Sequence, residues 1–125
     1  MNLILGTAQF GNGYGIKNNY KKIEIEKIVK ILDFAKENNV KYIDTAYNYQ
    51  FIEKVYKYYN FKDFNIINKI SYKDSLDYKK LETTLIDSLN KLNKEKYYCI
   101  LLHQPNLYEK KELTKVYNFL SKLKT

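Results

Sequence analysis

The feature that most constrains the fold is a regular alternation of short apolar runs with longer amphipathic stretches. The apolar runs predict four strands, at Leu3–Leu5, Val40–Asp44, Phe64–Ile70 and Tyr97–His103. The amphipathic stretches predict four helices between and after them, at Glu24–Asn38, Ile52–Tyr59, Asp77–Asn93 and Glu109–Leu123. Strands that alternate with helices in this way favour an α/β fold, with parallel strands and right-handed crossovers.

The boundaries of these elements carry recognisable signals. The first helix has one apolar stripe at helical spacing, formed by Ile25, Ile28, Val29, Leu32 and Ala35. Asn38 and Asn39 predict its end, because Asn tolerates the left-handed backbone that closes many helices. The run Tyr97–His103 is continuously apolar, which is typical of a strand covered on both faces, and Pro105 follows it.

The chain has 125 residues, which is the length of one domain. Four βα units fit two architectures, either a small open doubly wound sheet or half of a (β/α)8 barrel. Hydrophobic periodicity does not choose between them, because it reports each element and not the order of the strands.

Composition argues against several classes of protein. The net charge is +8 and all 22 basic residues are lysines, but they are interleaved with acidic residues along the chain. This pattern is typical of a solvated surface, so nucleic-acid binding is a minor alternative and we expect no such partner. We also expect no membrane partner, because the apolar runs are far shorter than the ~20 residues of a spanning helix.

The cysteine and histidine content limits the remaining choices. One cysteine, Cys99, cannot form an internal disulfide, and we see no signal peptide, so we expect a reduced, cytoplasmic chain. One cysteine and one histidine cannot build a structural zinc site, so we expect no metal.

Titratable residues stand at the ends of three predicted strands. Asp44 ends the second, Lys69 lies near the end of the third, His103 ends the fourth, and Tyr49 follows Asp44 by five residues. Since the carboxyl ends of parallel strands form the functional face of α/β folds, these side chains predict a site. Each also has an ordinary interpretation: Asp44 as a helix cap, Lys69 as a surface lysine, Tyr49 as one of 14 tyrosines, and His103 as a core or capping residue.

The glycines Gly11, Gly13 and Gly15 resemble a nucleotide-binding loop only in composition. They lack the G-x-G-x-x-G spacing, and no Gly-Lys-Ser/Thr sequence occurs in the chain. A plain turn after the first strand is the favoured interpretation.

Four motifs together resemble the aldo/keto reductases. They are GTAQFG at 6–11, DTAYNY at 44–49, Asn68-Lys69, and LLHQP at 101–105. The resemblance covers essentially residues 1–125 and implies one truncated domain, the N-terminal half of a (β/α)8 TIM barrel. It further implies an oxidoreductase that reduces a small carbonyl substrate with NADPH or NADH and without a metal.

The resemblance also implies roles for individual residues. Tyr49 would be the general acid that protonates the carbonyl oxygen, and the Lys69 ammonium would favour its phenolate. Asp44 would pair with Lys69, and His103 would orient the substrate carbonyl. An ordinary tyrosine has a pKa of ~10, whereas an effective general acid has a pKa near the working pH. A neighbouring cation lowers the pKa of the tyrosine because it stabilises the phenolate.

Residues near the cofactor follow from the same resemblance. Gly6, Thr7 and Asp44 would lie at its nicotinamide end. One departure from the family pattern is Gln50-Phe51-Ile52 before Glu53, where small residues are usual, and it changes the rim of the site.

A complete barrel of this type has eight βα units, and this chain provides four. Its outer strands, Leu3–Leu5 and Tyr97–His103, would therefore have unpaired edges. We expect activity to require completion of the barrel, either as a homodimer or by a complementary C-terminal half. The alternative function is a non-catalytic remnant, or an interaction module that pairs with another chain.

Overall fold

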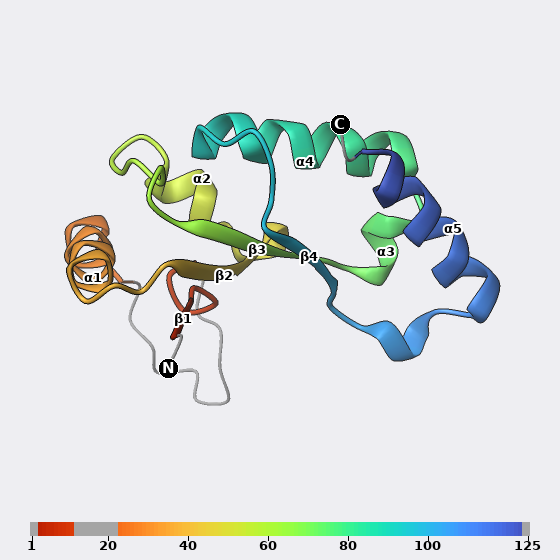
Figure 1. Cartoon of the computed structure of the whole chain (residues 1–125), viewed down its shortest axis with the longest axis horizontal. Helices are drawn as coiled ribbons and strands as arrows, with labels where there is room; N and C mark the ends of the chain where they lie inside the picture. The colour runs from red at the N-terminus through yellow and green to blue at the C-terminus, as the bar shows by residue number, and fades with distance from the viewer. Residues whose placement is uncertain (1–2, 12–22, 124–125) are drawn as a thin grey trace.

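A parallel four-stranded sheet lies at the centre of the molecule (Figure 1). The computed structural model describes residues 3–11 and 23–123. The strands are β1 (Ile4–Gly6), β2 (Tyr42–Ala46), β3 (Asn65–Ile70) and β4 (Cys99–Leu102), and they pair in the order β1-β2-β3-β4. In a doubly wound sheet the order of the strands reverses at a switch point, whereas in a barrel strands that are consecutive in the sequence are also neighbours in space. The strand order therefore matches half of a (β/α)8 barrel.

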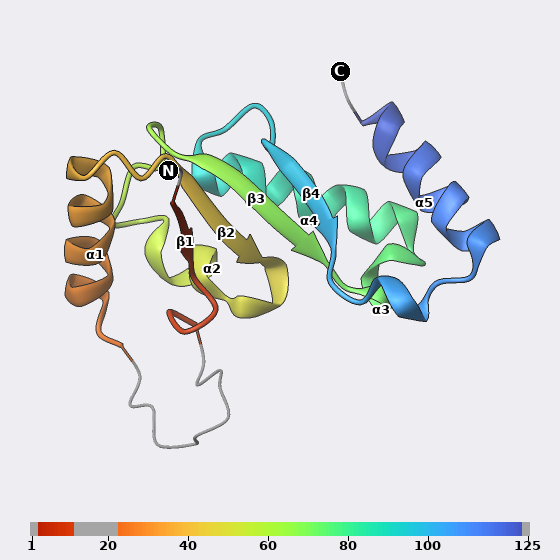
Figure 2. The same ribbon diagram turned by 60° about the horizontal axis from the view of Figure 1, so that its bottom comes forward.

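The helices of the described residues are α1 (Ile25–Glu37), α2 (Phe51–Val55), α3 (Tyr72–Ser75), α4 (Tyr78–Leu92) and α5 (Lys110–Lys122). In Figure 1, α2 and α4 lie above the sheet. Figure 2 shows the same arrangement turned, with α1 and α5 at opposite ends of the sheet. Among the described residues, α2 and α4 thus cover one face of the sheet, and we call the opposite face the open face.

The predicted order of the eight main elements is confirmed, but some boundaries are not. The helix predicted at Ile52–Tyr59 ends at Val55, because the chain turns at Tyr56. The short helix α3 and two single 3₁₀ turns, Tyr47–Tyr49 and Pro105–Leu107, were not predicted, since segments this short carry no periodicity. The predicted stop after α1 is confirmed at Asn39, which has a left-handed φ of 59°.

The expectation that the last strand is covered on both faces is wrong for the described residues. Leu101 of β4 is 43% exposed, and the other residues of this strand are only partly buried. The physical reason is the architecture: helices cover one face of the sheet, and the opposite face would be the interior of a complete barrel.

Two hydrophobic clusters cover the helical side. The first joins β2 and β3 to α1 and α2, and its fully buried members include Ile28, Leu32, Ile43, Phe51 and Ile66. The second joins β3 to α4 and α5 through Ile70, Leu81, Leu85, Tyr108 and Val116.

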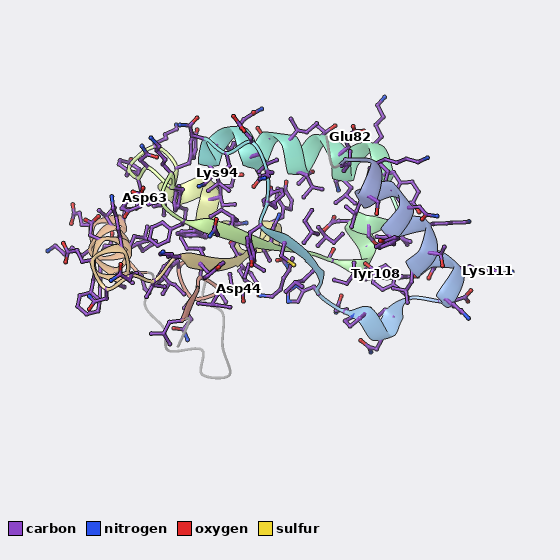
Figure 3. The ribbon with its side chains drawn as sticks, in the orientation of Figure 1. Asp44, Asp63, Glu82, Lys94, Tyr108 and Lys111 are labelled. Atoms are coloured by element: carbon purple, nitrogen blue, oxygen red, sulfur yellow. The ribbon has the colours of Figure 1, made fainter. Side chains whose placement is uncertain are left out.

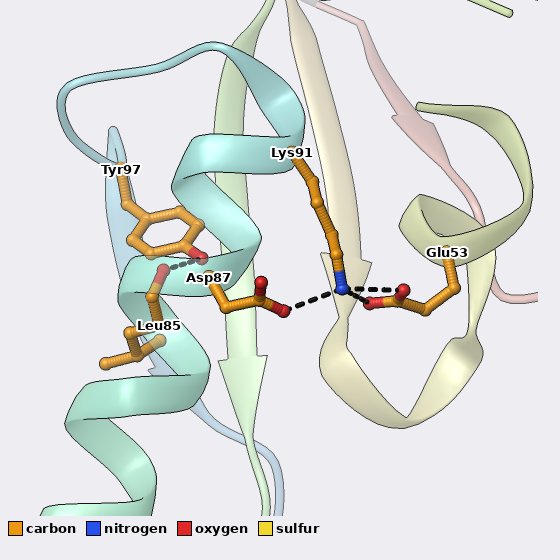
Figure 4. Close-up of polar contacts among 5 residues, drawn as sticks. All are labelled: Glu53, Leu85, Asp87, Lys91 and Tyr97. Atoms are coloured by element: carbon orange, nitrogen blue, oxygen red, sulfur yellow. Dashed lines mark hydrogen bonds and ion pairs between the residues drawn. The ribbon is translucent and has the colours of Figure 1, made fainter. Parts of the chain in front are cut away.

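Polar contacts link α4 to α2 and to the residues before β4 on the covered face of the sheet (Figure 4). The Lys91 ammonium of α4 lies 2.6 Å from a carboxylate oxygen of Asp87 and 2.8 Å from one of Glu53, which belongs to α2. Asp87 and then Glu53 raise the pKa of Lys91 through these hydrogen bonds. The Tyr97 hydroxyl donates to the Leu85 carbonyl at 3.1 Å, which attaches the start of β4 to α4.

Candidate active site

The register of the sheet brings Asp44 and Lys69 together. Asp44 pairs with Ile67, and Lys69 lies two residues further along β3, so both side chains point to the same face. This is the open face of the sheet, away from α4, where Figure 3 labels Asp44. The Lys69 ammonium donates to both carboxylate oxygens of Asp44, at 2.6 Å for Oδ2. The side chains are 20% and 31% exposed, so water screens this pair only in part.

Tyr49 and His103 lie beside this ion pair. Tyr49 belongs to the 3₁₀ turn after β2 and is 9% exposed, and its ring centroid lies 5.7 Å from the Lys69 Nζ. His103 follows β4, and its backbone N–H donates to the Ile70 carbonyl at 2.9 Å, which continues the β3–β4 pairing. The rings of Tyr49 and His103 meet edge to face, with centroids 5.9 Å apart. The structure therefore brings together all four residues predicted to be catalytic.

Gly6 and Thr7 lie at the end of β1, next to Asp44, but they differ in accessibility. Gly6 pairs with Asp44 in the sheet, and a Cβ added at Gly6 would meet no atom within 4 Å. Thr7 is fully buried, and its hydroxyl donates to the Asp44 carbonyl at 3.0 Å. Open space for a ligand thus lies over Gly6, and Thr7 acts on the backbone of Asp44.

Asn68 belongs to the covered face, although it stands beside Lys69 in the sequence. Because side chains alternate along a strand, it points toward α4 and is 1% exposed. Burial raises the pKa of Tyr97, whose hydroxyl lies on the same covered side of the sheet. Asn68 is therefore a packing residue of the outer layer.

Gly11 is a site residue that sequence reasoning missed. It is buried against the backbone of Tyr49, and its only sequence signal is its place at the end of the GTAQFG motif. The other glycines of the predicted turn, Gly13 and Gly15, lie outside the described residues.

Two further observations concern the described part of the chain. None of its helices is long and apolar enough to cross a membrane. It also contains no cluster of three or more His, Cys, Asp or Glu side chains that could hold a metal ion.

Comparisons with known proteins agree on one family. The family model described as "Aldo/keto reductase family" matches residues 2–125. No curated protein sequence matches the chain. Among solved structures, an aldo-keto reductase from Pseudomonas aeruginosa superposes with a TM-score of 0.75 at 21% identity, over 97% of this chain and 50% of that one.

Two other solved structures give the same result. A protein from Brucella melitensis described as an aldo/keto reductase has a TM-score of 0.66 at 21% identity, over 97% of this chain and 43% of that one. The thermostable aldo-keto reductase Tm1743, solved with the inhibitor epalrestat, has a TM-score of 0.63 at 23% identity, and the match covers 95% of this chain and 43% of the Tm1743 chain. The chain thus spans about half the length of the structures it resembles.

Proposed function

Since the chain belongs to the aldo/keto reductase family, we propose that it carries the proton-transfer residues of an NAD(P)H-dependent carbonyl reductase. Family and fold support an oxidoreductase-like function. The observation that carries the finer proposal is the side-by-side position of the Tyr49 ring, the Lys69 ammonium and the His103 ring at the strand ends.

The residues present fit the nicotinamide end of the cofactor. Gly6 leaves open space directly beside the half-buried Asp44 carboxylate, and a side chain at this position would fill it. Gly6 and Asp44 would hold that end, while Thr7 fixes the Asp44 backbone from behind. When bound, NAD(P)H supplies the hydride for the carbonyl carbon.

The four side chains divide the proton transfer among them. The Tyr49 hydroxyl donates a proton to the substrate's carbonyl oxygen, and the Lys69 ammonium stabilises the phenolate that remains. Asp44 prevents Lys69 from becoming an uncompensated charge in a half-buried position. His103 hydrogen-bonds the same carbonyl and orients it toward Tyr49.

This reaction also requires a second half-barrel, which we propose is supplied by a complementary C-terminal half or by a second copy of the chain. The open face exposes apolar side chains that would be barrel interior: Leu101 at 43% and Ile4 at 54%. The strands β1 and β4 each pair with only one neighbour among the described residues, so both edges can accept a further strand.

The test is carbonyl-dependent NADPH oxidation by the purified chain, alone and mixed with a separately expressed C-terminal half-barrel from a family member. We expect activity only when the barrel is complete, and Tyr49→Phe should reduce kcat by roughly 10²–10⁴-fold. Tyr117→Phe, at a residue 71% exposed, is the matched control and should keep wild-type activity. Equal activity of Tyr49→Phe and wild type would remove Tyr49 from its role.

The alternative function, an interaction module without catalysis, is favoured by the same exposed apolar face. It predicts a stable complex of defined stoichiometry in light scattering, with no change in NADPH fluorescence at any stage. For either function we propose a cytoplasmic location, which agrees with the single, partly buried Cys99.

A further inference from the structure

The segment that follows β1 contacts the backbone of Asp44. Both the N–H and the hydroxyl of Thr7 donate to the Asp44 carbonyl, at 3.0 Å each. The Phe10 N–H donates to the Thr7 carbonyl at 2.9 Å, so the chain turns tightly after Thr7. The Phe10 ring then packs on Phe51, with centroids 5.4 Å apart, at the start of α2. Residues 7–11 therefore contact both β2 and the start of the helix that follows it.

Gly11 lies closer to Tyr49 than any other residue type could. A Cβ at this position would stand 1.6 Å from the Tyr49 carbonyl oxygen and 2.8 Å from its carbonyl carbon. Both distances are shorter than a non-bonded contact allows, and the atoms concerned are backbone, which cannot rotate away as a side chain can. A side chain at position 11 must therefore displace the turn that carries Tyr49, the segment 7–11, or both, and either displacement changes how the two backbones fit together.

We propose that Gly11 is a positioning residue, which holds Tyr49 beside Lys69 and His103 through direct contact with the Tyr49 backbone. Residues 7–11 then fix both halves of the site, since Thr7 holds Asp44 and Gly11 sets the place of the phenol. The consequence for catalysis rests on the proposed role of Tyr49, because a displacement of about 1 Å is enough to impair proton transfer. The geometric claim is independent of that role.

The only histidine of the chain provides a direct measurement. The rings of His103 and Tyr49 meet edge to face, so the ring current of Tyr49 acts on the ring protons of His103 and contributes to their signal in a ¹H NMR spectrum. Tyr49→Leu, which removes the aromatic ring, defines the full size of this contribution. We expect Gly11→Ala to move the signal away from its wild-type position and to weaken the nuclear Overhauser effect between the two rings.

Gly6→Ala is the matched control, because the same added methyl group meets no atom within 4 Å. It should leave the His103 signal and its contact with Tyr49 unchanged. Circular dichroism establishes that each variant is folded. If Gly11→Ala does not fold, Phe10→Leu loosens the same segment through its contact with Phe51, and it should also move the His103 signal.

The proposal would be overturned if Gly11→Ala folded and kept the wild-type His103 signal and ring contact. It would also be overturned if Tyr49→Leu left the His103 signal unchanged. If Gly11→Ala does not fold, an unchanged His103 signal in Phe10→Leu would overturn the proposal. None of these outcomes depends on turnover. The proposal that Gly11 positions Tyr49 and the proposal that Tyr49 is the general acid can therefore be refuted independently of each other.

Discussion

The two hydrophobic clusters differ in how completely they are closed. The first, between β2, β3, α1 and α2, contains several side chains that are fully buried, such as Ile28 and Leu32. The second, which joins β3 to α4 and α5, has few buried members and is surrounded by partly exposed side chains such as Leu102 and Leu113. Asp44, Tyr49 and Lys69 belong to elements of the first region, whereas His103 follows β4. The proton-transfer group is thus built on the better-packed part of the molecule.

The largest expected difference between the regions is in cavity formation. Leu32→Ala should lower the free energy of unfolding by about 3–4 kcal/mol, because Leu32 is completely enclosed. Leu81→Ala makes the same change in the second cluster and should cost about 2–3 kcal/mol, since its surroundings can move into the space. Urea unfolding followed by circular dichroism measures both. A larger loss for Leu81→Ala would reverse the ranking of the two regions.

A smaller difference is expected between the site ion pair and the outer one. Asp44→Asn removes the countercharge from Lys69, which is only 20% exposed, and should cost about 1–2 kcal/mol in unfolding experiments. Asp87→Asn leaves Lys91 paired with Glu53, and the carboxylate that is lost is 53% exposed, so the expected loss is about 0.3–0.5 kcal/mol. Equal losses would show that the Asp44–Lys69 pair is no more protected from water than the surface pair.

A third difference between the regions is expected only at alkaline pH, so neither region shows it near neutrality. Burial, with a hydrogen bond involving Asp33, raises the pKa of Tyr59 to about 12 in the folded first region. An unfolded tyrosine titrates near ~10, so the folded state retains a proton that the unfolded state loses. This stabilisation is complete below about pH 10 and is lost as the pH rises toward 12.

Tyr59→Phe should therefore make the urea midpoint fall less steeply between about pH 9.5 and 11.5 than it does in wild type. In the second region, burial also raises the pKa of Tyr108, and Tyr108→Phe should flatten the same curve to a smaller extent. Parallel curves for Tyr59→Phe and wild type would contradict the raised pKa of Tyr59.

Much of the fold could be predicted from local patterns. The apolar stripe of α1, the run around β4 and the pair Asn38–Asn39 each report the structure of their own segment. The site was predicted less evenly. Asp44, Lys69 and His103 were found because they stand at predicted strand ends, while Tyr49 was noted for its place five residues after Asp44, and the family motif then distinguished it from the other 13 tyrosines. Gly11 was not found, because its contact with Tyr49 spans 38 residues of sequence.

The amino-acid sequence by itself determined the alternation of strands and helices and placed three polar residues at strand ends, because hydrophobic periodicity is a local property. Hydrophobic periodicity left the order of the strands open, and the tertiary structure shows β1, β2, β3 and β4 in consecutive order, as in the half-barrel that the family resemblance implied. It also decided that Thr7 holds Asp44 and that Gly11 touches Tyr49. Pairing between distant segments depends on register and packing in three dimensions, and no local pattern encodes it.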